Sequence, residues 1–337
     1  MSRIYYLDAM RSILMMLGIV LHAAVVLSDG SWLFEINESN LYNSISDFIH
    51  LFRMPAFFII SGFFCHMTLS RYGARLFLKV RIPRILIPLI VTALTLNSLQ
   101  NYLLSGYSPV EFSLYASEYW LEGRWVSHLW FLISLIYYFF IFTFCYYFFK
   151  TIVVTLLNWI SWLYLRSSAL SLILISIITV LTIKVSYLVS FIVPNNQYDW
   201  GLGETLYYCI YFFFGFMAGH NRKVLDHFTQ FSWSTIIVTL LVLCSAYWLL
   251  ESQLIASINT LKLLITSLCS WLLSYFCFLL FKRLYNTQSK FFSYFSEASY
   301  SIYLFHHVLI IAYAIVLYQF ALPYWLMFLL LMLITFI

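Results

Sequence analysis

Long continuous apolar segments separated by short polar ones are the dominant pattern of this chain. Most of them approach the ~20 residues that an α-helix needs to cross a bilayer, whereas a β-barrel would show short segments of alternating polarity. We therefore predict an all-α polytopic membrane bundle of about ten transmembrane helices, forming one domain over residues 1–337. The predicted spans are 9–28, 44–68, 83–104, 127–149, 168–193, 204–220, 232–250, 258–281, 297–318 and 322–337.

Basic residues are sorted among the loops that this pattern leaves. The basic loops are 69–82, 150–166, 221–223 and 282–290, and all of them fall on the side of the N-terminus, while the alternate loops are mainly acidic. Because Lys and Arg in short loops remain on the cytoplasmic side, the sorting predicts a cytoplasmic N-terminus.

Three segments need separate interpretation. Segment 151–165 is apolar but short, and a spanning helix there would invert every later loop, so we predict an interfacial or re-entrant helix. Asp8 and Arg11 interrupt the start of the first apolar segment and His22 lies within it, which favours a retained helix over a cleaved signal peptide. The last segment ends at Ile337 without a polar flank, so we expect that the sequence is a fragment or that its last helix continues further.

Composition narrows the function classes. Hydrophobic residues make up 63% of the chain and charged residues 9%, which excludes an ordinary soluble domain. The positive residues behind the net charge of +5 are concentrated in the loops on one side of the bundle, so no nucleic-acid partner is expected. The six cysteines are scattered without CxxC or Cys/His spacing, so we predict no metal site.

Ionisable residues inside the predicted spans indicate a functional site, because they are costly in a membrane. Arg11 and His22 are eleven residues apart on the first helix, so they share a face and lie about 16 Å apart along its axis. Asp8 precedes Arg11 by three residues and is close enough to pair with it. Arg11 is expected near the cytoplasmic mouth and His22 near the midplane.

The second helix runs back toward the cytoplasm and carries Asp47, His50 and Arg53 at positions i, i+3 and i+6. Counted from the cytoplasmic ends, Arg53 falls within roughly 5 Å of the depth of His22. Further along, the Ser61-Gly62 pair permits close approach of a neighbouring helix.

Two later spans add histidines. The ninth begins on the cytoplasmic side near Glu297, and His306 and His307 lie about 15 Å further along it, near the midplane. Because adjacent residues point to different faces, at least one of the two should face protein. The fourth span begins outside with His128 and Trp130.

These residues form two sets with different chemistry: imidazoles and Arg53 near the midplane, and Arg11, Arg81 and Arg84 at the cytoplasmic mouth. Imidazole suits general-base work on a hydroxyl, and guanidinium recognises phosphate. The spacing fits a coenzyme A thioester threaded into the bundle. Taken singly, the loop arginines are more simply determinants of topology, and a lone buried histidine is more often a packing residue.

At these residues the sequence resembles the acyltransferase type 3 family of membrane acyltransferases. The resemblance extends over most of the chain. Within the family, the sequence resembles the branch that succinylates osmoregulated periplasmic glucans. It is carried by YYLDAMRSILMMLGIVLH (5–22), DFIHLFRMPAFFIISGFF (47–64), VRIPR (80–84), SHLWFL (127–132) and SYSIYLFHH (299–307).

The resemblance implies a ten-helix transferase of the bacterial inner membrane, with a cytoplasmic acyl-CoA as co-substrate and no permanently bound cofactor. It implies that His22 is the catalytic base with Arg11 as its partner, and that Arg81 and Arg84 help to hold acyl-CoA. The residues expected to contact the substrate or the acyl group are Asp47, His50, Arg53, His128, Trp130, His306 and His307. The residues expected to support them are Asp8, Ser61 and Glu297.

The expected reaction is transfer of an acyl group, succinyl from succinyl-CoA before acetyl from acetyl-CoA, to hydroxyls of a periplasmic glucan or another extracytoplasmic glycan. Partners would be membrane lipid, the glycan acceptor and the glucan-synthesis machinery. One alternative is an acetyltransferase of a surface polysaccharide in the same family. Another is a proton-coupled secondary transporter, since buried His, Asp and Arg also build such carriers.

Overall fold

The computed structural model describes residues 4–29, 33–34, 40–104, 119–192, 202–230, 233, 236–237, 240–242, 245 and 259–336. All regular structure in these ranges is helical, in agreement with the predicted all-α class. The helices are α1 (Tyr5–Val26), α2 (Asn40–Leu94), α3 (Leu96–Leu104), η1 (Ser127–Leu129), α5 (Trp130–Phe148), α6 (Lys150–Arg166), α7 (Ser168–Ile192), α8 (Leu202–His220), α9 (Arg222–Phe228), α12 (Asn259–Leu284), α13 (Lys290–Tyr318) and α14 (Tyr324–Phe336).

Six helical segments in the described part of the chain are long and apolar enough to cross a membrane. They are Tyr5–Val26, Leu41–Leu104, Ser127–Phe148, Leu170–Val189, Asn259–Leu284 and Lys290–Tyr318. The predicted span 232–250 lies mostly outside the described residues, and α14 has only 13 residues. The total of about ten spans and the orientation of the N-terminus therefore stay predictions.

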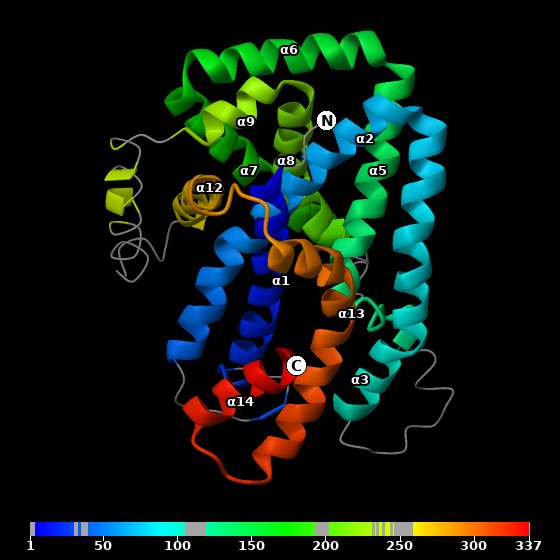
Figure 1. Ribbon diagram of the computed structural model, residues 1–337, viewed down its shortest axis with the longest axis vertical. Helices are drawn as coiled ribbons and strands as arrows, with labels where there is room; N and C mark the ends of the chain where they lie inside the picture. The colour runs from blue at the N-terminus through cyan, green and yellow to red at the C-terminus, as the bar shows by residue number, and fades with distance from the viewer. Residues whose placement is uncertain are drawn as a thin grey trace.

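The helix labelled α2 consists of two halves joined at Gly73. The backbone there has φ 75° and ψ 165°, a conformation that favours glycine because it lacks a Cβ. The two halves run in opposite directions from this turn (Figure 1), and the spans predicted at 44–68 and 83–104 lie before and after it.

The first half of α2 crosses α8 at very short range. A Cβ atom on Gly62 would lie 2.0 Å from the carbonyl oxygen of Phe212, and one on Gly215 would lie 1.9 Å from that of Ile59. Both contacts are to backbone, so no side-chain movement can relieve them. The close approach predicted at Ser61-Gly62 is confirmed: Gly62 faces the α8 backbone at Phe212 and Phe216, and Gly215 of α8 faces Ile59.

Polar and aromatic contacts attach α5 to the same pair of helices. Ser134 on α5 shares a hydrogen bond of 2.7 Å with Thr205 on α8. Trp130, the first residue of α5, stacks on Tyr208, which in turn stacks on Phe58 of α2. These contacts fix the start of α5, and with it the short helix η1, against α2 and α8.

The helix α6 lies across one end of the bundle, along the ends of its neighbours (Figure 1). It has 17 residues, contacts α5, α7, α8 and α9, and is attached to α8 by a hydrogen bond of 2.9 Å between Asn158 and His220. The helix falls on the segment 151–165 for which an interfacial or re-entrant helix was predicted, and its relation to the membrane stays a prediction.

The glycine contact between α2 and α8 yields a stability prediction. In Gly62→Val or Gly215→Val, the β-branched side chain would overlap sterically with a backbone atom of the facing helix. We expect the free energy of unfolding to fall by about 1–3 kcal/mol or more. This fall should appear as a lower midpoint of thermal unfolding for the protein purified in detergent.

Thr155→Val on the exposed face of α6 is the control, because it introduces the same side chain where no helix faces it. An unchanged midpoint for both glycine variants would contradict the close crossing.

Candidate active site

A cavity of about 350 Å³ lies between α1, α2, α3, η1 and α13. It is bordered by most of the polar residues that the sequence placed near the midplane. Its lining is Leu21, His22, His50, Arg53, Met54, Gln100, Leu104, Ser127, His128, Trp130, Phe131, Tyr303 and His307. We call it the histidine cavity.

Four imidazole rings form a cluster beside this cavity, and three of them, those of His22, His128 and His307, line it. The ring centre of His22 lies 5.1 Å from that of His306 and 4.5 Å from that of His307. His128 stacks on His307 at 4.9 Å with an interplanar angle of 14°. The predicted meeting of α1 and α13 is confirmed, and both histidines of the adjacent pair are buried and contact His22, where the sequence required only one. His128, expected near the outer surface, joins the cluster.

Hydrogen bonds fix the proton on His306. Its Nδ1 lies 3.0 Å from the carbonyl oxygen of Ile302 and 2.8 Å from that of Tyr303. A carbonyl oxygen can only accept, so Nδ1 carries the hydrogen and Nε2 of the neutral ring holds a lone pair. This Nε2 atom is buried and has no hydrogen-bond partner within the described part of the chain, so it is available as a proton acceptor.

Among the described residues, Arg53 is the one fixed cation that lines the histidine cavity, and it is only 5% exposed. Its Nε donates to the carbonyl oxygen of Leu14 at 2.9 Å. The guanidinium then crosses α1 at Gly18, where an added Cβ would lie 2.4 Å from Nη2. The lack of a side chain at Gly18 therefore determines where the charge of Arg53 sits.

The charge of Arg53 has no acidic counterpart in the described ranges, where ion pairs join Arg124 to Glu122 and Lys282 to Asp226. A buried cation without a counterion is costly unless a ligand supplies one. The geometry therefore suits a substrate that carries a negative charge to this depth.

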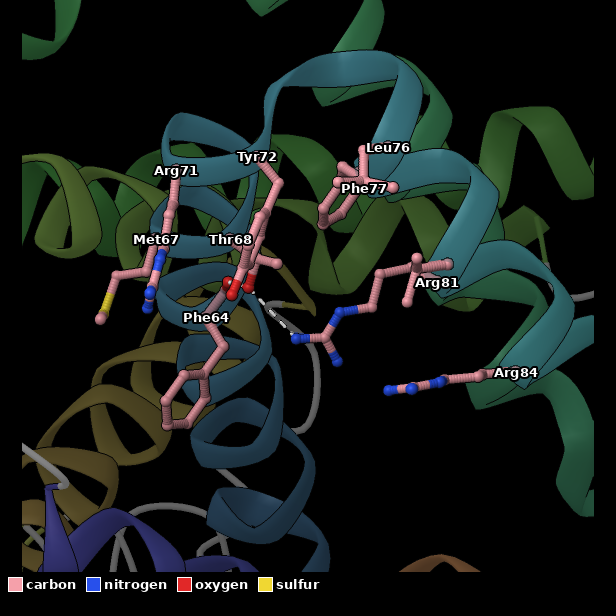
Figure 2. A pocket seen from close by; sticks show the side chains of 10 residues that line it. Phe64, Met67, Thr68, Arg71, Tyr72, Leu76, Phe77, Arg81 and Arg84 are labelled. Carbon is pink, nitrogen blue, oxygen red and sulfur yellow. Dashed lines mark hydrogen bonds between the residues drawn. The ribbon is translucent and has the colours of Figure 1, made fainter. Parts of the chain in front are cut away.

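A second cavity of about 450 Å³ opens between the two halves of α2, beside the Gly73 turn. Arg81 reaches across from the second half and donates to Thr68 Oγ1 at 3.1 Å, and Arg84 extends beside it one turn further on (Figure 2). The lining also includes Arg71, whose guanidinium lies 5.2 Å from the ring centre of Tyr72. We call it the arginine cavity.

One face of α2 connects the two cavities. Met54 borders the histidine cavity and Phe64 borders the arginine cavity, and ten residues of helix correspond to about 15 Å. Ser61 lies on the same face between them, because Met54, Ser61 and Thr68 are spaced by seven residues, nearly two full turns. An elongated ligand along this face would touch both.

The remaining predicted residues lie around these cavities. Arg11 is half-buried on α1 and lines neither cavity, although the sequence grouped it with Arg81 and Arg84. Asp8 accepts a long hydrogen bond of 3.5 Å from Ser296 on α13, while Asp47 and Glu297 are exposed. No finding assigns a role to these four residues.

Among the residues that border the histidine cavity, sequence reasoning missed two whose side chains hydrogen-bond a histidine. Gln100, on the short helix α3, hydrogen-bonds His307, and the hydroxyl of Tyr303 donates to the carbonyl oxygen of His128. A buried Gln near the end of an apolar segment was a signal that could have pointed to the first of these. Nothing in the pattern distinguishes Tyr303 from the other 26 tyrosines.

Comparison with known proteins identifies the family. The model of a family described as an acyltransferase domain matches residues 4–337. Glucans biosynthesis protein C of Escherichia coli strain K12 is 32% identical over 334 residues, which cover 91% of this chain and 82% of that protein. The protein of the same name in Shigella dysenteriae serotype 1 is 31% identical with the same coverage. No solved structure matches the chain. The chain therefore belongs to the acyltransferase type 3 family and is an acyl-transferring enzyme.

Proposed function

We propose that this protein transfers an acyl group, succinyl in the first place, from cytoplasmic acyl-CoA to a hydroxyl of a periplasmic glucan across the bacterial inner membrane. The observation that carries the proposal is the histidine cavity, where a buried imidazole cluster and the buried charge of Arg53 border one space. The relatives named for glucan biosynthesis support a glucan acceptor.

The arginine cavity is suited to the nucleotide end of acyl-CoA. Arg81 and Arg84 offer guanidinium groups on consecutive turns of one helix, and guanidinium forms paired hydrogen bonds with phosphate oxygens. Phosphates held there would leave the pantetheine arm to follow α2 past Ser61. The thioester would then reach the histidine cavity.

His22 would act as the general base. It would take the proton from the acceptor hydroxyl as the hydroxyl oxygen bonds to the thioester carbonyl carbon. When the carbon–sulfur bond breaks, coenzyme A leaves as a thiolate and takes up the proton held by His22. Nε2 of His306, which lies in a ring that contacts His22, can accept a hydrogen bond from the protonated base. An acyl-histidine intermediate is the other route that this geometry permits.

Arg53 would select the acyl group. A succinyl chain brings a second carboxylate into the bundle, and this charge needs a partner at the same depth. Arg53 lacks an acidic counterpart among the described residues and borders the cavity where the acyl group would lie. An acetyl donor would leave that buried charge unused, which makes succinyl the better fit.

The two other functions account for fewer of these structural features. An acetyltransferase of a surface polysaccharide would use the same cavities but not Arg53. A proton-coupled transporter would also contain buried imidazoles, but membership of an acyltransferase family favours the enzyme. Release of free coenzyme A separates the enzyme from the transporter.

The base is tested with purified protein, succinyl-CoA or acetyl-CoA, and a β-glucan oligosaccharide. We expect thiol release and a succinyl mass increment on the glycan, and a fall of about 100-fold or more in kcat for His22→Ala, since general-base catalysis contributes roughly 10²–10⁴-fold. His227→Ala, on α9 and outside both cavities, is the matched control. An acetyl increment alone would remove the succinyl assignment, and no thiol release with any donor despite binding would favour the transporter.

The arginine cavity is tested by the KM for the donor. Arg81→Ala should raise the KM for succinyl-CoA about 10- to 100-fold with a smaller change in kcat, because one charge-assisted hydrogen bond to the donor is lost. Arg75→Ala removes an exposed arginine of the same segment that does not line the cavity. Equal effects of the two variants would mean that only overall positive charge matters.

The selectivity role of Arg53 is tested by comparing donors. Arg53→Gln should lower kcat/KM for succinyl-CoA relative to acetyl-CoA by about 10- to 100-fold. Gly18→Ala should act in the same direction with the charge intact, because the added methyl displaces the guanidinium. The role is refuted if both variants lose activity with the two donors in equal proportion.

A further inference from the structure

The side-chain amide of Gln100 links two parts of the histidine cavity that come from different elements. Gln100 is 5% exposed and stands on α3, which packs against α13. Its Oε1 atom lies 2.6 Å from Nδ1 of His307, and its Nε2 donates to Ser127 Oγ at 3.0 Å. One amide thus contacts an imidazole of the cluster and the residue that precedes His128.

The second contact is made at an unusual backbone position. Ser127 begins η1 with φ 37°, in the left-handed region that residues with a Cβ rarely adopt. Two bonds hold His128 beside it: the Gln100–Ser127 bond, and the Tyr303 hydroxyl that donates to the carbonyl of His128. Strained backbone of this kind persists where the surroundings determine it.

The first contact determines which nitrogen of His307 carries hydrogen. With Nε2 of Gln100 donating to Ser127, Oε1 is the atom that faces His307, and an amide oxygen only accepts. Nδ1 of His307 is then the donor, and Nε2 of the neutral ring holds the lone pair. His306 has the same tautomer, set by backbone carbonyls. Both rings contact His22.

We propose that Gln100 is a positioning residue for the transfer reaction, which fixes the tautomer of His307 and the place of His128. In this role it acts through the two histidines. Two neighbouring rings with lone pairs on Nε2 can accept hydrogen from His22 and so support it as the base that carries the proton between hydroxyl and thiolate. The inference rests on the proposed function.

Other polar groups also face His307, and the variants used in the test must leave them unchanged. These groups are His22 from α1, Arg53 from α2, His128 from η1, and Tyr303 and His306 from α13. Gln100 supplies the acceptor at Nδ1 of His307, at 2.6 Å. Variants of Gln100 alone therefore isolate this contact.

The test compares three variants in the succinyl-CoA assay. Gln100→Leu removes the acceptor and should lower kcat about 10- to 100-fold with little change in the KM for succinyl-CoA. Gln100→Glu keeps an acceptor for Nδ1 and should restore most of the activity. Asn97→Leu is the control. Asn97 stands one turn earlier on α3, and its side chain donates to the carbonyl oxygen of Trp125 at 2.7 Å. It therefore holds the segment that leads into η1 and α5 without a hydrogen bond to a histidine.

A second readout is independent of activity. In protein labelled with ¹⁵N at histidine, the ring nitrogens of His307, assigned with a His307→Ala sample, should show hydrogen on Nδ1 in the wild type and in Gln100→Glu. Gln100→Leu should change this signature, and Asn97→Leu should not. A wild type without acyl transfer would refute the proposed function, while the nitrogen signals would still decide the role of Gln100.

The proposal is overturned if Gln100→Leu keeps both the wild-type kcat and the wild-type tautomer of His307. It is also overturned if Asn97→Leu reproduces the loss of kcat and the change of signature. In that case a general loosening of the connection before α5 would account for the effect. Unfolding midpoints of the two Leu variants show whether their stabilities are comparable.

Discussion

The cost of holding a guanidinium inside an apolar bundle is the constraint around which the site is built. Arg53 is almost fully buried, and its only hydrogen bond to the described protein is to the carbonyl of Leu14. Gly18 leaves room for the charged group to cross α1. The polar side chains that line the cavity with it are imidazoles, hydroxyls and the Gln100 amide, which carry no obligatory charge, so they do not add a second fixed cation in a medium of low dielectric constant.

The close contact of α2 with α8 supplies the rigidity that this arrangement needs. Gly62 and Gly215 bring the two backbones together, and hydrogen bonds and stacked aromatic rings attach α5 to them. Within lipid there is little hydrophobic gain from helix association, so close packing and interhelical hydrogen bonds hold the bundle together. The position of Arg53 on α2 is fixed by the same contact.

The part of the site that could be predicted from the sequence follows from the fixed rise of an α-helix. Counting residues brought His22, Arg53 and the His306–His307 pair to one depth, and the structure confirms that these side chains meet. Counting gives no information about side chains whose positions depend on connections. His128 in the short η1 and Gln100 after the end of α2 reach the cluster through tertiary folding. The arginine cavity likewise depends on the turn at Gly73, which a single glycine in the sequence does not specify.

The single helical face that joins the two cavities makes α2 a molecular ruler. Met54 and Phe64 stand on the same half of α2, so about 15 Å of helix separates the histidine cavity from the arginine cavity. If acyl-CoA is the donor, as proposed above, it must match this length as well as the chemistry at either end. A thioester on a short carrier could occupy one cavity but not both. Selection against small intracellular thioesters would then follow from geometry, without any residue that rejects them.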